Sequence, residues 1–188
     1  MFVKPDEIAR MERLYGRPAE DRVAFEMARK DWSILKGSQV HGRAHDVTVY
    51  VRRGEEVAVI AKHPYPPGIF RAPSGGVMPT ESMEEGIARE MMEELGLEIV
   101  LRRYLLREVA QFTHDGEVVR WTTHVFTADP LTTDLAPHDL KEIREARWIS
   151  MDELTGRIGE ALAASHSAGL RYRAYLHRRV MQELSRQT

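Results

Sequence analysis

The sequence predicts a single α+β domain in which strands surround one acidic helix, with further helices at both ends of the chain. Two observations support this prediction. Runs rich in β-branched residues, separated by turn formers, lie on both sides of residues 82–95, as expected for strands. Residues 82–95 themselves repeat apolar side chains at helical spacing and end at a glycine.

Composition limits the class of protein. At 188 residues, with 43% hydrophobic residues and a formal charge of −2, the chain can bury one sizeable core but is too short for two ordinary domains. It has no cysteine, which excludes a disulfide framework, a thiol nucleophile and a zinc–cysteine site. We find no long apolar run, no signal-like amino terminus and no overall basic charge. We therefore expect a cytoplasmic protein without a membrane partner.

The first part of the chain is predicted to be a helical extension over residues 1–36, before a domain over residues 37–188. Apolar side chains are interspersed among charges in residues 5–36, and a Gly-Arg-Pro sequence at residues 16–18 divides this segment into halves. A lid and a homodimer contact are two uses of such an extension. Packing on the core is favoured, because amphipathic helices usually bury their apolar face.

Strand patterns follow. Residues 46–61 alternate around a Gly-containing turn and predict a hairpin. A loop rich in turn formers occupies residues 62–68. Two strands are predicted at residues 99–112 and 118–126, and a shorter one at residues 146–149. Helical patterns return in the last part of the chain.

The helix predicted at residues 82–95 has clear start and stop signals. Ser82 is a good N-cap, acidic residues occupy the first turn, and Gly96 is a natural stop. At about 100° per residue, its side chains divide into an apolar arc and a charged arc. The apolar arc is expected to hold Ile87, Ala88, Met91, Met92 and Leu95. The charged arc is expected to hold Arg89, Glu90, Glu93 and Glu94.

Three carboxylates on the charged arc indicate a metal site. Glu90, Glu93 and Glu94 stand at i, i+3 and i+4, so they project into one small volume. They stay ionised together only beside a counter-charge, and Arg89 alone supplies too little. Mg²⁺ or Mn²⁺ is the natural complement, because these cations prefer oxygen ligands. The Ser-Gly-Gly loop at residues 74–76 favours this interpretation over a solvated helix face, since its backbone can approach a cation or a phosphate.

The segment from Gly75 to Leu97 carries the pattern Gly-x5-Glu-x7-Arg-Glu-U-x-Glu-Glu-x-Gly-U, where U is bulky and apolar. It resembles the Nudix box of the Nudix hydrolase superfamily. The resemblance implies an α/β/α sandwich with a mixed sheet, here with extra helices at both ends. It also implies a Mg²⁺- or Mn²⁺-dependent enzyme that hydrolyses a nucleoside diphosphate linked to another moiety. A small nucleotide is the expected substrate, either a nucleotide sugar such as ADP-ribose or a nucleoside triphosphate.

The resemblance also implies the metal ligands. Glu90 and Glu94 would be the principal ligands, and Glu93 would contribute directly or through a water molecule. A main-chain carbonyl of Ser74 or Gly75 would complete the protein's share of the coordination.

Two further box residues are expected to act behind the ligands. Arg89 would pair with Glu81 and Glu93 and hold the loop against the helix, without touching the substrate. Gly96 would allow the chain to turn out of the helix, which is a structural role.

Substrate contacts are implied near residues 62–71. Tyr65 is a candidate for stacking on a base, and Lys62 or Arg71 for contacting a phosphate. The residues alone favour an ordinary connecting loop, because prolines and aromatic side chains are common in packed loops.

Several carboxylates are candidates for the general base. Many Nudix enzymes place a further acidic residue before the last strand, where it binds a metal or activates water. Glu142 is preferred, because its loop position gives more reach than a strand side chain. Glu145 is second, Glu90 would serve if fewer metals bind, and Asp139 is retained as a candidate.

Two alternative functions are weighed against the leading one. A basic cluster near the C-terminus would suit hydrolysis at an RNA 5′ end, but a solvated helix is the favoured interpretation and no nucleic-acid partner is expected. A non-catalytic nucleotide sensor is the other alternative, and the complete set of box carboxylates weighs against it. The basic cluster comprises Arg171, Arg173, His177, Arg178 and Arg179.

Overall fold

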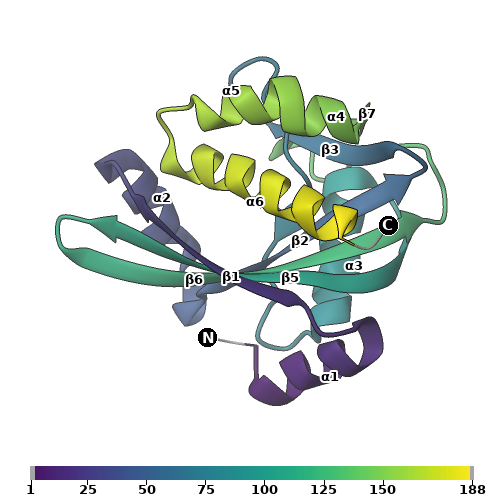
Figure 1. Ribbon diagram of the computed structural model, residues 1–188, viewed down its shortest axis with the longest axis horizontal. Helices are drawn as coiled ribbons and strands as arrows, with labels where there is room; N and C mark the ends of the chain where they lie inside the picture. The colour runs from purple at the N-terminus through teal and green to yellow at the C-terminus, as the bar shows by residue number, and fades with distance from the viewer. Residues whose placement is uncertain (1–2, 187–188) are drawn as a thin grey trace.

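The computed structural model, which describes residues 3–186, contains a mixed seven-stranded sheet with helices on both faces (Figure 1). The strand order is β1-β5-β6-β2-β3-β7, and β4 pairs with β2. The pairs β1–β5 and β6–β2 are parallel and the others antiparallel. The strands are β1 (Ala19–Glu26), β2 (His45–Arg53), β3 (Glu56–Lys62), β4 (Ser74–Gly75), β5 (Ile99–His114), β6 (Glu117–Pro130) and β7 (Ile143–Ser150). The helical segments are α1 (Pro5–Tyr15), α2 (Arg29–Ser38), η1 (Val40–Gly42), α3 (Met83–Leu95), α4 (Met151–Glu153), η2 (Leu154–Ile158), α5 (Gly159–Ala163) and α6 (Ala168–Ser185).

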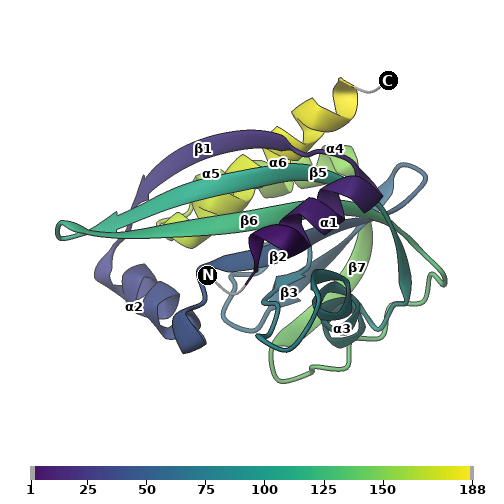
Figure 2. The same ribbon diagram turned by 90° about the horizontal axis from the view of Figure 1, so that it is seen from below.

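The sheet separates two hydrophobic cores. One core joins the strands to α6, η2 and α5, and the other joins them to α3 and α1. Viewed from below, α1 and α3 lie in front of the sheet and α6 lies behind it (Figure 2). The predicted α/β/α sandwich with a mixed sheet and extra terminal helices is confirmed. No helix in the described part of the chain is both long enough and apolar enough to cross a membrane.

Most predicted elements are present, with longer strands than expected. The hairpin at residues 46–61 is formed by β2 and β3, and its turn places Gly54 at a φ of 57°. β5 and β6 form a long hairpin that turns at Asp115 and Gly116, both at positive φ. β7 begins at Ile143, three residues before its predicted start, because it follows β3 as far as Lys62.

The helical prediction for residues 5–36 is wrong at its centre. The helix α1 ends at Tyr15, next to the predicted break, and Ala19–Glu26 then forms the edge strand β1. Alternate residues of β1 are half-buried and exposed, which is a period of two. Its Val-Ala-Phe run fits a period of two as well as a helical period. The segment is a strand because it pairs with β5 along its whole length. The proposed boundary at residue 36 stays a prediction, although β1 belongs to the same sheet as the rest.

The helix α1 packs on the core, as expected. Glu7 accepts a hydrogen bond from the backbone N–H of Met83 at 2.8 Å, at the start of α3. Arg10 and Tyr15 both contact the carboxylate of Glu84, in the first turn of α3. The extension therefore supports the N-terminus of the helix that carries the predicted site.

A gap between β2 and β3 gives the site its place in the fold. These strands pair only near their turn, at Arg52–Val57 and Arg53–Glu56, and then diverge. Residues 71–75, here called the wedge, fill the space between them. Arg71 bridges to Ile60 of β3, and Ser74 and Gly75 pair with β2 as β4. The backbone hydrogen bonds of the wedge are thus satisfied by both strands, which holds the loop in one position.

One buried carboxylate sets a pH dependence. Glu108 of β5 lies beside Asp21 of β1, and neither of its carboxylate oxygens has a hydrogen-bond partner among the described residues. Burial, reinforced by the charge of Asp21, raises the pKa of Glu108 to about 7. The folded protein therefore favours the neutral acid. Stability should fall as the pH rises from the unfolded pKa, about 4.3, through the folded one.

We expect Glu108→Gln to raise the melting temperature by on the order of 5 °C at pH 8 and by less at pH 5, since it removes the cost of ionisation. Thermal unfolding at the two pH values measures the difference, and Glu98→Gln at an exposed position is the matched control. An equal gain at both pH values would contradict the assignment.

Candidate functional site

The helix α3 begins and ends as predicted. Ser82 accepts from the backbone N–H of Glu85, whose carboxylate accepts from the N–H of Ser82, forming a capping box. Gly96 ends the helix at a φ of 69°, and a Cβ there would lie 2.1 Å from the carbonyl oxygen of Ala136. Only glycine fits this position, so its structural role is confirmed.

The expected division of α3 into two arcs is wrong at two residues. Ala88 is exposed, whereas Glu94 is only 4% exposed. At about 100° per residue, Glu94 lies between Met83 and Met91 on the helix circumference. Ala88 lies beyond Met91, at the edge of the buried face. The buried face is therefore centred nearer to Glu94 than the residue types suggest. The structure places this carboxylate inside the protein, against the wedge.

Glu94 is surrounded by donors. Its Oε2 accepts from the backbone N–H of Ser74 at 2.7 Å. Its Oε1 lies 3.4 Å from Lys62 Nζ and 3.5 Å from Arg71 Nη2. A buried carboxylate requires such partners, because its desolvation is otherwise too costly.

Glu90 lies directly over the glycine pair. Its Oε1 accepts from the N–H of Gly76 at 3.1 Å and from Arg89 at 2.9 Å. A Cβ on Gly75 would lie 1.7 Å from Glu90 Cδ, so any side chain there would displace the carboxylate. Burial raises the pKa of Glu90 against the lowering effect of Arg89, and the charge of Glu94 raises it further.

Arg89 clamps the helix to the loop. It pairs with both oxygens of Glu81, at 2.7 and 3.1 Å, and with Glu93 at 3.0 Å, which confirms the predicted contacts. It also donates to the carbonyl oxygen of Gly76 at 2.7 Å. The Arg89 guanidinium lowers the pKa of Glu81, so this pair stays charged.

The carboxylates have more counter-charge than Arg89 provides. Lys62 and Arg71 both face Glu94, in addition to the Arg89 that the sequence places beside the cluster. These two residues lie outside the helix, on β3 and the wedge, so helical spacing could not place them there. Burial lowers the pKa of Lys62, and the charge of Arg71 lowers it further, whereas the charge of Glu94 raises it.

The structure uses Arg71 differently from the prediction. Arg71 is 2% exposed, so its guanidinium faces protein groups and not an open surface. It donates to the Tyr65 hydroxyl at 3.0 Å, to Ala72 O at 2.8 Å and to Ser74 Oγ at 2.8 Å. Tyr65 is half-buried against the core. Burial opposes ionisation of Tyr65, but the charges of Arg71 and Arg173 outweigh it and lower its pKa.

Glu142 is brought to the site by its loop. The carbonyl oxygens at the end of α3 accept from the backbone N–H groups of Ala136, His138 and Asp139, which docks the loop on the helix. Glu142 is exposed and contacts Lys62, which lies between it and Glu94.

The other candidate bases lie elsewhere. Glu145 is exposed on β7 opposite Ala61, and Asp139 accepts from the N–H groups of Lys141 and Glu142 within its own turn.

The donor set suits a hard divalent cation in its chemistry. Two carboxylates, those of Glu90 and Glu94, flank the backbone of residues 74–76, and their mutual repulsion is what a cation would relieve. Within residues 3–186, no three histidine or acidic side chains stand close enough together to hold an ion. Glu93, predicted as the third carboxylate, faces Arg89 and its side chain is 45% exposed. The geometry thus supports two carboxylates better than three.

The helix α6 is neither a solvated surface helix nor a basic surface. Arg173 contacts Asp46 and Thr48, His177 is buried against Tyr50, and Arg179 pairs with Asp21. Arg171 caps the carbonyl oxygens of residues 165–166. Of the five basic residues in the cluster, only Arg178 is exposed. The favoured interpretation is therefore wrong: burial of one helix face on the sheet brings Arg173, His177 and Arg179 against partners within the protein.

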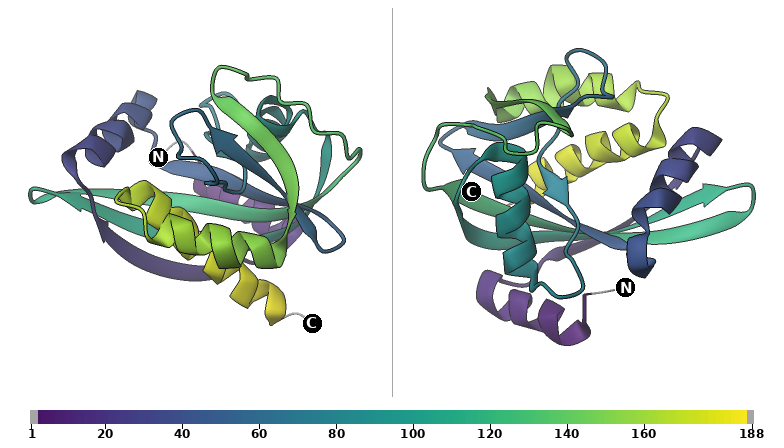
Figure 3. Two further views of the ribbon diagram at one scale, coloured as in Figure 1. Left: turned by 90° about the horizontal axis from the view of Figure 1, so that it is seen from above. Right: turned by 180° about the vertical axis from the view of Figure 1, so that it is seen from behind.

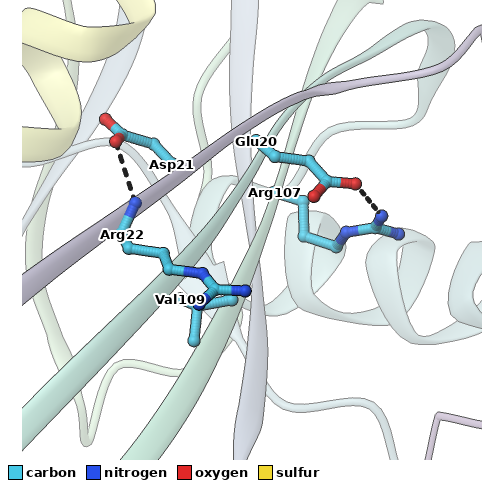
Figure 4. A pocket seen from close by; sticks show the side chains of 5 residues that line it. All are labelled: Glu20, Asp21, Arg22, Arg107 and Val109. Atoms are coloured by element: carbon cyan, nitrogen blue, oxygen red, sulfur yellow. Dashed lines mark hydrogen bonds and ion pairs between the residues drawn. The ribbon is translucent and has the colours of Figure 1, made fainter.

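The two cavities described lie away from these carboxylates. One, of about 340 Å³, is lined by residues of β1 and β5, and the ion pair of Glu20 with Arg107 joins the two strands there (Figure 4). The other, of about 610 Å³, lies between α1 and β5. Neither strand carries a predicted site residue, and the helix α3, which carries the carboxylates, lies in front of the sheet when the molecule is seen from behind (Figure 3, right).

Fold and site together define a class of protein: a mixed sheet between helices, with paired helix carboxylates against a glycine loop in a strand gap. A family model described as the NUDIX domain matches residues 41–169. The chain belongs to the Nudix family, which confirms the resemblance of residues 75–97.

Two relatives are bacterial proteins described as "NAD-capped RNA hydrolase NudC". The protein of Chromobacterium violaceum is 32% identical over 108 residues, covering 57% of this chain and 38% of that protein. The protein of Pseudomonas aeruginosa is 30% identical over 131 residues, covering 70% and 43%. The chain thus spans less than half the length of these relatives.

Solved structures share the fold. A UDP-X diphosphatase superposes with a TM-score of 0.54 at 14% identity, covering 84% of this chain and 72% of that one. A NUDIX hydrolase from Nitrosomonas europaea gives a TM-score of 0.54 at 16% identity, covering 77% and 90%. At these identities the likeness shows the fold alone.

We expect Gly75→Ala to weaken Mn²⁺ binding at least about tenfold, because the new Cβ would push Glu90 from the loop. Titration of Mn²⁺ followed by electron paramagnetic resonance measures this directly. Gly37→Ala is the matched control, since nothing lies within 4 Å of its Cβ and alanine is favoured within α2. Unchanged binding in Gly75→Ala would show that Glu90 is not a ligand.

Proposed function

We propose that this protein is a metal-dependent pyrophosphohydrolase that cleaves the phosphoanhydride of a nucleoside diphosphate linked to another moiety. The observation that carries the proposal is the pairing of Glu90 and Glu94 with the backbone of residues 74–76. Members of the family generally use a divalent metal, and Mg²⁺ or Mn²⁺ suits these oxygen donors. A cytoplasmic location belongs to the same proposal, because nucleotide-linked substrates are made and used there. A homodimer stays a prediction.

The names of related proteins support the substrate class. Relatives are described as hydrolases of NAD-capped RNA and a solved neighbour as a UDP-X diphosphatase. All of these names denote a nucleoside diphosphate joined to a second group. A small nucleotide sugar is the leading candidate, and a nucleoside triphosphate is the second.

Each box residue then has a defined task. Glu90 and Glu94 would hold the cation with a carbonyl oxygen of Ser74 or Gly75, and the amides of the loop keep both carboxylates oriented. A bound cation would polarise the phosphoanhydride and lower the pKa of the attacking water. Arg89 fixes the loop against α3 through Gly76 O.

Side chains beside the metal ligands would handle protons and charge. Glu142 would accept the proton of the attacking water, with Lys62 holding it near Glu94. Lys62 and the half-buried Tyr65 are the proposed substrate contacts. Arg71 would act on the substrate only through Tyr65 and Ser74, because it is buried.

We expect Glu142→Gln to lower kcat by about 10²- to 10⁴-fold while metal binding is retained, as for loss of a general base. Glu145→Gln, three residues further on, is the matched control and should keep its activity. Steady-state rates with a saturating substrate decide between them. A normal rate in Glu142→Gln would move the role to another carboxylate, with Glu90 the first to test.

A second function has one observation in its favour. Hydrolysis at an RNA 5′ end is suggested by the description of the bacterial relatives. The surface of α6 gives it no support, because most of its basic cluster faces inward. A non-catalytic sensor is the other alternative, and it would bind a nucleotide without turnover.

The decisive test is a hydrolysis panel with Mg²⁺ or Mn²⁺, covering nucleotide sugars, dinucleotides, nucleoside triphosphates and 5′-capped RNA, with products resolved by mass. We expect one class of substrate to be cleaved at its phosphoanhydride. The rate of this cleavage should fall at least about 10³-fold in Glu94→Gln. Glu98→Gln is the control at an exposed site. Tight binding without cleavage across the panel would refute the enzyme and leave the sensor.

A further inference from the structure

Arg173 points from α6 into the protein. Its Nη2 donates to Asp46 Oδ2 at 3.0 Å, and its Nη1 donates to Thr48 Oγ1 at 3.1 Å. Only 17% of the side chain is exposed. The two nitrogens of one guanidinium thus reach two successive inward-facing residues of β2, a geometry that a lysine ammonium cannot reproduce.

A buried network fixes the position of Arg173. Asp46 also accepts from Trp121 Nε1 at 3.0 Å and from Thr123 Oγ1, and Thr123 accepts in turn from Tyr172 at 2.7 Å. Burying such an ion pair is often no more stabilising than apolar packing of the same volume. A polar cluster at the helix–sheet contact is therefore better explained by positioning than by stability.

Thr48 connects this network to the wedge. Its backbone pairs with Ser74 of β4, and the neighbouring Val49 N–H donates to Pro73 O at 3.1 Å. The N–H of Ser74 donates to Glu94. A short path thus joins the Arg173 guanidinium to Glu94, the carboxylate proposed to bind metal. It runs through the Thr48 hydroxyl and then through the backbone pair of Thr48 with Ser74.

The charge of Arg173 also affects residues beside Glu94. Burial raises the pKa of Tyr65, and Arg173 is, after Arg71, one of the positive charges that lower it. It also adds to the effects of burial and Arg71 that lower the pKa of Lys62. Arg173 therefore stands close to the cations that face Glu94, although it lies on the helix covering the opposite face of the sheet.

We propose that Arg173 is a positioning residue for the metal site, which locks β2 through Thr48 so that the N–H of Ser74 holds Glu94 in place. The inference rests on the proposed function, because it assumes that Glu94 binds the metal. It assigns to α6 a role in the reaction that neither the box nor its basic character indicates.

The test uses two conservative variants and their combination in the full chain. Arg173→Lys keeps the charge and loses the fork, and Thr48→Val removes only the hydroxyl that links Arg173 to the strand. Mn²⁺ binding is measured by electron paramagnetic resonance, with kcat, KM and the melting temperature on the same samples. Arg178→Lys, at an exposed position of the same helix, is the control.

We expect each single variant to bind Mn²⁺ about tenfold more weakly and the double variant no more weakly than the worse single one, because both changes break one path. KM at saturating metal should change little. Wild-type Mn²⁺ affinity in the folded variants, or a lower melting temperature with unchanged affinity, would overturn the inference. Additive losses would also overturn it, since they mean that Arg173 does not act through Thr48. Absence of both Mn²⁺ binding and hydrolysis in the wild type would instead refute the proposed function.

Discussion

The site depends on one constraint, the fit of the loop backbone at residues 74–76 against the carboxylates of α3. Two N–H groups of this loop donate to Glu94 and Glu90, and no side chain fits on Gly75. Backbone donors cost no side-chain entropy, so they orient two like charges that would otherwise repel. The gap between β2 and β3 makes this possible, because it gives the wedge hydrogen-bond partners on both sides.

Elements outside the box hold α3 and the wedge in place from several sides. The helix α1 supports the start of α3 through Glu7, and the loop that carries Glu142 docks on its last carbonyl oxygens. On the far face of the sheet, the network around Asp46 ties α6 to β2. Elements around the family motif are therefore part of the site's support, and two of them, α1 and nearly all of α6, lie outside the residues 41–169 that the family model matches.

Three cations of the protein already face the carboxylates at the site. Lys62, Arg71 and Arg89 face the carboxylates of α3, and two of these cations lie outside the helix. A divalent cation would therefore have to compete with existing contacts to Glu94. Such competition suits a site where metal and substrate phosphates arrive together, because the phosphates bring the negative charge that Lys62 can then meet.

The sequence by itself determined the strands on both sides of the box from residue 46 on, the limits of α3 and the residues of the box, because caps, turns and spacing are local. Only the tertiary structure decided the rest. The period of Ala19–Glu26 fits two structures, and pairing with β5 chose the strand. The inward direction of Glu94 and Arg173 depends on which face of each helix meets the sheet. Lys62 and Arg71 reach Glu94 because β2 and β3 diverge beyond their turn and the wedge fills the gap, and this contact has no local signal in the sequence.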